Sequence, residues 1–260
     1  MIKRGSIKWK IKRLFDFIIS SPFFIGKSFL RNVFLAYQPD SFDLHFEHTE
    51  FNLLFKKFIK KNKRNNSGDI SRLWSLILNI KQIILDNVKG DFAEVGVWKG
   101  NTAAVLAFYA NKHNRKVYLF DTFKGFNKKD IKGIDSDKSS ELKIKNFHDT
   151  SITIVKDNIG DDYAACEIVE GYFPESLNEN HNNKTFAIVH LDCDLYEPTR
   201  SGLEFFYTKM SPGGIFILHD YSNCSWTGSK KAIDEFILLK KENLILMPDK
   251  SGSAFFRKNK

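Results

Sequence analysis

The sequence predicts an α/β fold with a doubly wound, mostly parallel, seven-stranded Rossmann-like sheet and an N-terminal helical extension. From residue 91 onward, short apolar runs alternate with helical stretches, which is typical of parallel strands joined by crossover helices. Four of the five runs end in an acid or a glycine-rich turn, at the edge where such sheets bind ligands. With 260 residues and 42% hydrophobic content, the chain can bury one sizeable core.

The positive charge of the chain is concentrated in its N-terminal part. Residues 1 to 64 contain 14 Lys and Arg against 5 Asp and Glu, and this surplus of 9 equals the net charge of the whole sequence, +9. The remaining residues are balanced, so we expect no nucleic-acid partner for the main domain. We place the domain boundary in the polar stretch 62–68, which gives an extension of residues 1–66 and a main domain of residues 67–260.

Residues 1–36 combine basic and apolar side chains at the spacing of an amphipathic helix. One face of this helix would carry an apolar row, namely Ile7, Ile11, Leu14 and Ile18. Two interpretations have equal weight. The helix is a peripheral contact with an anionic membrane surface, or it packs on its own domain or on a second subunit of a homo-oligomer.

The same region argues against membrane insertion and secretion. Asp16, Lys27 and Arg31 interrupt the apolar run, so no segment approaches the roughly 20 uncharged residues that a membrane span needs. No small-x-small cleavage site precedes Tyr37, which disfavours a signal peptide. The three cysteines are widely spaced and indicate neither a disulfide framework nor a zinc cluster. We therefore expect a cytoplasmic protein, with the inner face of the membrane as the place of any peripheral contact.

The expected elements of the main domain follow in a regular order. Two helices are predicted at about residues 47–62 and 69–88, the second with Asp69 as its N-cap. Five strands are predicted at the apolar runs 92–97, 117–120, 167–169, 186–191 and 215–218. The stretches 244–247 and 254–257 are expected to form a closing antiparallel hairpin.

The turn after the first strand contains Glu94, Gly96 and Gly100, before a helix that is expected to begin near Asn101. The two glycines would let the backbone approach a ligand. A pyrophosphate-binding turn has the spacing GxGxxG, whereas this turn reads ExGxxxG and its acid would repel a phosphate. The turn therefore favours a cationic, amine-bearing ligand.

Asp121 ends the second predicted strand, 25 residues after Gly96. A doubly wound fold places a carboxylate that binds ribose hydroxyls at about this position. A helix cap or a turn is the alternative role for this aspartate. Given the preceding turn, ribose binding is the better supported of the two.

Two further strands end in ionisable side chains. Asp192 and Asp194 follow the fourth strand, just before a helix that Pro198 would open, and His219 and Asp220 follow the fifth. If these strands are neighbours, Asp192 and Asp220 lie side by side. Carboxylates so placed could hold a hard divalent cation or act as a general-base pair.

Six stretches of the chain now form a recognisable series: EVGVWKGNTA, DTFKGF, VEGYFPESL, HLDCDLYEPT, SPGGIFILHDY and KKAIDEF. From about residue 91 to the end, the chain resembles the macrocin O-methyltransferase (TylF/MycF) family of class I methyltransferases. HLDCDLYEPT is the one specific stretch taken alone, and the ordered set is a strong signal.

The resemblance implies an S-adenosylmethionine-dependent O-methyltransferase that acts on a sugar hydroxyl with Mg²⁺. Glu94 would lie near the amino-acid end of the cofactor and Asp121 on its ribose. Other cofactor-binding residues would be Gly96 and Gly100 in the turn after the first strand, and Gly171 and Tyr172 in the turn after the third strand. Asp192 and Asp220 would be the metal ligands, and Asp192 could also serve as the base for the acceptor hydroxyl.

The chain departs from the family at His219, where the best-known members have an acid. Magnesium prefers oxygen donors, whereas imidazole suits softer metals or none, so the departure puts the metal in doubt. His219 could instead be the general base, or it could fix the loop of Asp220 through a hydrogen bond. His190, inside a predicted buried strand, is interpreted as structural.

Three functions stay open at this point. The first is the metal-assisted or base-assisted methylation of a sugar or glycoconjugate hydroxyl, and the second is metal-independent methylation of another small-molecule nucleophile. The third is a degenerate fold that binds a partner through its basic extension. The acceptor pocket of such a fold is built from the extension and the segment 122–150, neither of which identifies the acceptor.

Overall fold

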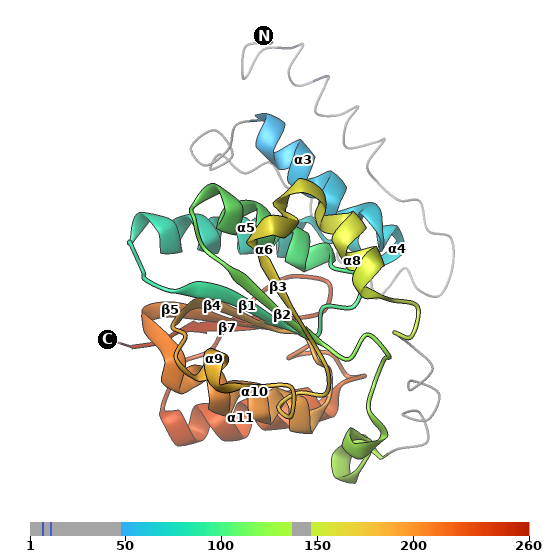
Figure 1. Ribbon diagram of the computed structural model, residues 1–260, viewed down its shortest axis with the longest axis vertical. Coiled ribbons are helices and arrows are strands. Elements are labelled where there is room, and N and C mark those ends of the chain that lie inside the picture. The colour runs from blue at the N-terminus through green and yellow to red at the C-terminus, as the bar shows by residue number, and fades with distance from the viewer. Residues whose placement is uncertain (1–6, 8–10, 12–47, 137–146, 260) are drawn as a thin grey trace. The chain divides into compact units, whose positions relative to one another are not determined.

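The computed structural model describes residues 7, 11, 48–136 and 147–259. Its compact unit Glu47–Lys260 is built on a seven-stranded sheet with the order β3-β2-β1-β4-β5-β7-β6 (Figure 1). The strands are β1 Asp91–Val95, β2 Val117–Asp121, β3 Cys166–Glu170, β4 Phe186–Leu191, β5 Met210–Leu218, β6 Ile245–Leu246 and β7 Ala254–Arg257. Strands β1 to β5 pair in parallel, and β7 runs antiparallel to β5 and β6. The predicted fold class and the closing hairpin are confirmed.

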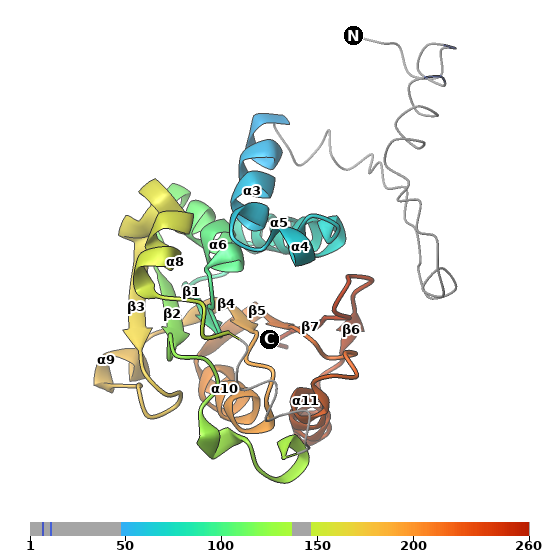
Figure 2. The ribbon, with the colours of Figure 1, turned by 90° about the vertical axis from the view of Figure 1, so that its right-hand side faces the viewer.

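Helices cover both faces of the sheet, as Figures 1 and 2 show. One face carries α3 His48–Lys60, α4 Lys63–Asn66, α5 Ile70–Leu85, α6 Asn101–Lys112 and α8 Ile152–Ile159. The other carries α9 Glu179–Asn182, α10 Tyr196–Lys209 and α11 Thr227–Lys240. The described residues also form three short 3₁₀ helices, namely η2 Lys128–Asp130, η3 Gly133–Asp135 and η4 Gly160–Ala165. Because both faces are covered, all six residues of β4 are buried, and all of them except His190 are apolar.

Helix α5 packs through an apolar stripe in which Leu73, Ile77 and Ile80 are fully buried. Asp69 precedes the helix as predicted, but its side chain does not cap it. Its Oδ1 atom accepts a hydrogen bond of 3.1 Å from the backbone N–H of Lys250, and its Oδ2 atom lies 3.3 Å from Arg72 Nε. Asp69 thus joins the start of α5 to the β6–β7 turn.

Two other starting points also differ from the sequence analysis. Helix α10 begins at Tyr196, two residues before Pro198. The compact unit begins at Glu47, before the boundary predicted after residue 66.

The predicted amphipathic helix of residues 1–36 lies almost entirely outside the described residues. Ile7 and Ile11 are described, and both are helical and exposed, by 77% and 57%. The membrane and subunit interpretations therefore stay predictions. Within the described ranges, no helix combines the length and the apolar character needed to cross a membrane. Residues 137–146 of the predicted acceptor segment also lie outside the description.

Phe206 of α10 is the centre of the core beneath the sheet. Its ring contacts those of four other phenylalanines, with centroid distances of 4.9 to 6.0 Å: Phe120, Phe173, Phe186 and Phe205. These partners come from β2, β4, α10 and the segment after β3. The cluster therefore fixes α10, and with it the β4–α10 loop, against two strands of the sheet and the segment after β3.

We expect Phe206→Ala to lower the free energy of unfolding by about 3 to 5 kcal/mol, because it leaves a cavity among four aromatic rings. Urea denaturation of the full-length protein measures the loss. Leu238→Ala, on the neighbouring helix α11, is the matched control because Leu238 is 82% exposed, and it should change the value by no more than about 0.5 kcal/mol. Equal losses in the two variants would contradict this description of the core.

Candidate active site

The carboxyl ends of the parallel strands surround one cavity of about 410 Å³. Eight of the predicted site residues line it: Glu94, Gly96, Asp121, Gly171, Tyr172, Asp192, His219 and Asp220. They follow five different strands, so the sheet brings together side chains that are up to 126 positions apart in the sequence, from residue 94 to residue 220. Gly100 is not part of this lining.

The two glycines after β1 meet protein atoms. Gly96 has φ +88°, and a Cβ atom there would lie 2.1 Å from the carbonyl oxygen of Asp192. Glycine is therefore required for the close approach of the turn to the end of β4. Gly100 has φ +74° and precedes α6, and its Cβ atom would lie 2.9 Å from Val155 Cγ1. Gly100 thus packs against α8, and the cofactor contact predicted for it stays a prediction.

Asp121 holds the turn after β1 in place. Its Oδ2 atom accepts hydrogen bonds from the backbone N–H groups of Val97 at 2.7 Å and Trp98 at 2.8 Å. Its Oδ1 atom accepts one of 2.7 Å from Phe123 N–H. Burial raises the pKa of Asp121, and these three hydrogen bonds act against that rise. Both oxygens have backbone partners, and the contact of Asp121 with a ribose stays a prediction.

Glu94 is a buried carboxylate on β1, directly beside His190 of β4 in the strand register. Its Oε1 atom lies 2.9 Å from His190 Nδ1, whereas its Oε2 atom is buried and has no hydrogen-bond partner among the described residues. Burial raises the pKa of Glu94, and His190 lowers it. A buried oxygen without a partner in the wall of a cavity suits a ligand that carries a hydrogen-bond donor or a positive charge.

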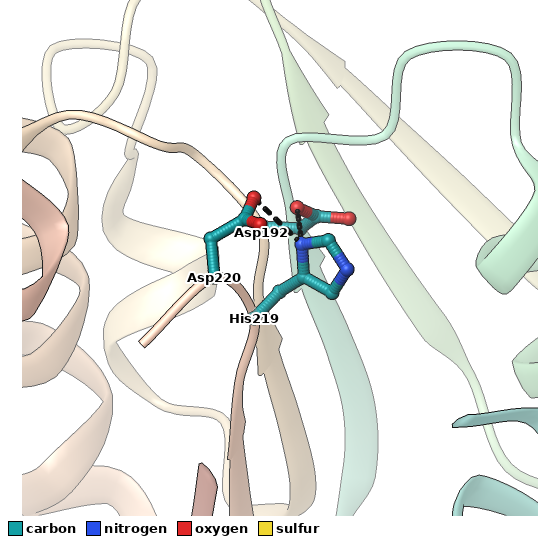
Figure 3. Close-up of side chains that lie close together, drawn as sticks. All are labelled: Asp192, His219 and Asp220. Atoms are coloured by element: carbon teal, nitrogen blue, oxygen red, sulfur yellow. Dashed lines mark hydrogen bonds and ion pairs between the residues drawn. The ribbon is translucent and has the colours of Figure 1, made fainter. Parts of the chain in front are cut away.

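Asp192, His219 and Asp220 meet at the ends of β4 and β5 (Figure 3). His219 Nδ1 lies 2.7 Å from Asp192 Oδ1 and 2.9 Å from Asp220 Oδ2. Asp220 Oδ1 accepts a hydrogen bond of 2.7 Å from Asn223 Nδ2. Burial opposes ionisation of both carboxylates, but His219 holds the pKa of each below its usual value. The predicted proximity of Asp192 and Asp220 is confirmed, and the imidazole lies between them.

These three residues are also a potential ligand set for a metal ion, because one atom of each lies within 4.8 Å of the others. Two of the three side chains supply oxygen, which suits Mg²⁺, and the third supplies imidazole nitrogen, which does not. The metal-ligand roles of Asp192 and Asp220 stay predictions.

The sequence analysis missed Arg72, whose Nη1 atom lies 2.5 Å from His219 Nε2. Arg72 comes from α5, outside the sheet, and it lines the cavity together with residues of the α4 corner and the β6–β7 turn: Asn62, Asn65, Asn66, Asp69, Lys250 and Ser251. A signal for Arg72 exists, because it precedes the buried Leu76 by one helical turn and so falls on the inward side of α5.

The opposite part of the lining is aromatic. Trp98, Phe126, Phe147 and Trp226 line the cavity, and neighbouring rings lie 5.2 to 6.3 Å apart between centroids. The rings come from the turn after β1, the segment between β2 and α8, and the segment after β5. The cavity therefore has one wall of amide and charged groups and another of aromatic rings.

Comparison with known proteins identifies the family. The model of the macrocin-O-methyltransferase (TylF) family matches residues 68–258. The chain belongs to this family. The resemblance seen in the sequence motifs is thereby confirmed, over nearly the whole compact unit.

Two curated relatives of the family illustrate the similarity. Demethyldecarbamoylnovobiocin O-methyltransferase of Streptomyces niveus is 27% identical over 177 residues, which cover 64% of this chain and 65% of the relative. Mycinamicin III 3''-O-methyltransferase of Micromonospora griseorubida is 28% identical over 166 residues, which cover 58% of this chain and 63% of the relative. The chain thus matches somewhat less than two thirds of the length of these relatives.

Solved structures show the same fold. The O-methyltransferase NovP superposes with a TM-score of 0.66 at 23% identity, covering 82% of this chain and 99% of that one. The calicheamicin methyltransferase CalS11 superposes with a TM-score of 0.51 at 21% identity, covering 98% and 94% of the two chains. At these identities the similarity is evidence for the class I methyltransferase fold alone.

The contact between Gly96 and Asp192 gives a test of the site's framework. Because the Cβ atom of Gly96→Ala would overlap the Asp192 carbonyl, we expect the free energy of unfolding to fall by about 3 kcal/mol or more. Urea denaturation measures it. Gly68→Ala is the control, because no atom lies within 4 Å of its added Cβ, and it should change the value by no more than about 1 kcal/mol. A Gly96→Ala protein as stable as the control would refute the close contact.

Asp130, in the cavity wall, gives a test by pH. Burial raises its pKa from 3.8 to about 6, although Tyr172 donates it a hydrogen bond of 2.5 Å. The folded state therefore binds this proton more tightly than the unfolded state, and the stability from Asp130 is complete below about pH 4 and lost as the pH rises through about 6. Urea denaturation between pH 4 and 7 should show this decline, and in Asp130→Asn the decline should be smaller. Identical pH profiles would contradict the raised pKa.

Proposed function

We propose that the protein transfers a methyl group from S-adenosylmethionine to a hydroxyl of a sugar or glycoconjugate. The observation that carries the proposal is the presence of two carboxylates, Glu94 and Asp192, in the lining of one cavity. Glu94 offers a buried oxygen that has no partner among the described residues, and Asp192 offers an oxygen beside a fixed imidazole. Membership of the macrocin-O-methyltransferase family supports this reaction.

Several described residues fit S-adenosylmethionine. The free Oε2 atom of Glu94 suits the ammonium group of its amino-acid end, because this donor would satisfy a buried acceptor. Gly96, Asp121, Gly171 and Tyr172 line the same cavity and would hold the rest of the cofactor. When bound, the cofactor supplies a methyl group that is already electrophilic, so the protein has to orient an acceptor oxygen and remove its proton.

Asp192 is the base in this proposal. Its Oδ1 atom is held by His219 Nδ1 at 2.7 Å, and its Oδ2 atom has no partner in the described part of the chain. The low pKa that His219 gives Asp192 keeps the carboxylate ionised at neutral pH. Oδ2 would accept the proton of the acceptor hydroxyl as that oxygen forms its bond to the methyl carbon. His219 orients Asp192 and stabilises its charge, and Asp220 helps to hold the imidazole in place.

The lining of the cavity supports a sugar as the acceptor. The amides of Asn62, Asn65 and Asn66 can donate and accept hydrogen bonds to hydroxyls, and aromatic rings such as Trp226 provide an apolar wall. Relatives act on rhamnosyl tetracenomycin and mycinamicin III, and CalS11 is named as a TDP-rhamnose methyltransferase. If residues 1–36 contact a membrane surface, as proposed from their sequence, a lipid-linked glycan would be a suitable acceptor.

The first experiment is calorimetric titration of S-adenosylmethionine into the full-length protein, followed by assays of S-adenosylhomocysteine release with TDP-rhamnose and with simple rhamnosides. We expect Asp192→Asn to bind the cofactor within about threefold of the parent protein and to lose about 100-fold or more in turnover, because the base is removed without a change of shape. Asp234→Asn, on the exposed side of α11, is the control and should turn over normally.

Two outcomes would count against the proposal. A folded protein that does not bind S-adenosylmethionine would exclude methyl transfer from it. Unchanged turnover by Asp192→Asn would leave the reaction intact and remove Asp192 from the role of base.

A further inference from the structure

The contact between Arg72 and His219 determines which imidazole nitrogen carries a proton. Arg72 Nη1 and His219 Nε2 are 2.5 Å apart. A guanidinium group can only donate hydrogen bonds, so in this contact Nε2 is the acceptor and carries no proton. A neutral imidazole has one protonated nitrogen, which must then be Nδ1. This nitrogen faces the two carboxylates, as Figure 3 shows.

The same conclusion holds if the imidazole is charged. An imidazolium is protonated on both nitrogens, and Arg72 would then have to withdraw from Nε2. In both forms Nδ1 has a proton and no lone pair available, so His219 cannot offer this nitrogen to a metal ion. The conclusion follows from the position of the ring and does not depend on where it titrates.

We propose that the Nδ1–H group of His219 takes the place of a divalent cation between Asp192 and Asp220, and that Arg72 is the positioning residue that keeps it there. The proposal rests on the methyl-transfer function above and adds that the reaction needs no metal. One proton donor at 2.7 and 2.9 Å from an oxygen atom of each carboxylate links the two without an ion. Asp192 then acts as a base held by a hydrogen bond.

Few carboxylate oxygen atoms of Asp192 and Asp220 are left to bind a metal. Asp192 Oδ1 and Asp220 Oδ2 face the Nδ1–H group, and Asp220 Oδ1 accepts from Asn223. Asp192 Oδ2 is the one carboxylate oxygen of the triplet with no partner among the described residues. Mg²⁺ requires about six oxygen ligands in a regular octahedron, so its entry would break the existing hydrogen bonds.

Arg72 is itself held on three sides. Its Nη2 atom donates a hydrogen bond of 2.7 Å to Asn66 Oδ1, its Nε atom lies 3.3 Å from Asp69 Oδ2, and its guanidinium group lies 4.9 Å from the centroid of the Phe58 ring. Asn66 is buried and donates to the carbonyl oxygen of Phe58 at 2.8 Å. Residues of α3, α4 and the start of α5 thus hold the guanidinium group of Arg72 in a fixed position beside His219.

The first test measures metal uptake without an acceptor. Mn²⁺ is titrated into the full-length protein, with and without S-adenosylmethionine, and free Mn²⁺ is followed by electron paramagnetic resonance. We expect the parent protein to bind no Mn²⁺ at this site and His219→Asp to bind one equivalent, because the substitution completes a set of three carboxylates. Uptake by the parent protein that is lost in Asp192→Asn would overturn the proposal. Cofactor binding, measured separately, shows whether the proposed function still holds.

The second test reads the imidazole directly and stays informative if His219→Asp fails to fold. Long-range ¹H–¹⁵N spectra of protein with labelled histidine, assigned with His219→Asn, distinguish a protonated nitrogen from a bare one. We expect a protonated Nδ1 in the parent protein, a changed Nε2 resonance in Arg72→Met, and partial restoration in Arg72→Lys. Arg200→Met, on exposed α10, is the control and should leave the ring unchanged. A bare Nδ1 in the parent protein, or an unchanged Nε2 in Arg72→Met, would overturn the proposal.

Discussion

The close approach of β1 to β4 is the constraint on which the candidate site depends. Gly96 has room for no side chain because the carbonyl group of Asp192 occupies that space, and Asp192 N–H donates to Val95 O at 2.8 Å. Two residues earlier, Glu94 of β1 meets His190 of β4 inside the sheet. The wall that would hold the cofactor and the carboxylate that would activate the acceptor are therefore fixed to each other by backbone contacts.

The buried parallel strands are the part of the fold that could be predicted from the sequence. Strands covered on both faces are mostly apolar, and an acid at the end of such a run, as at Asp121 or Asp192, has few structural roles. The neighbouring positions of Asp192 and Asp220 followed from this pattern alone. The TylF motifs then added the cofactor and the order of the site residues, and the family match confirms that resemblance.

Contacts between distant segments could not be predicted in the same way. Asp69 has the sequence position of a helix cap, yet its oxygens meet Lys250 and Arg72, because the β6–β7 turn folds back over the start of α5. Gly100 has the spacing of a ligand-binding glycine, yet Val155 of α8 occupies the space beside it. In both cases the packing partner, Lys250 or Val155, lies 55 or more positions away in the sequence, so the local pattern could not indicate it, and the cofactor contact of Gly100 stays a prediction.

The charges of Asp192 and Asp220 explain why helix α5 contributes to the candidate active site. Two carboxylates at adjacent strand ends repel each other, and the Nδ1 atom of His219 lies between them, 2.7 and 2.9 Å from an oxygen atom of each. His219 in turn can present its Nδ1–H group to both only if its other nitrogen has a donor, and that donor comes from α5. Movement of the α4–α5 corner would release Arg72, free the imidazole to turn and expose the two carboxylates to each other. The geometry of the proposed base is therefore set by helices that lie outside the sheet, and the arrangement of those helices belongs to the candidate active site.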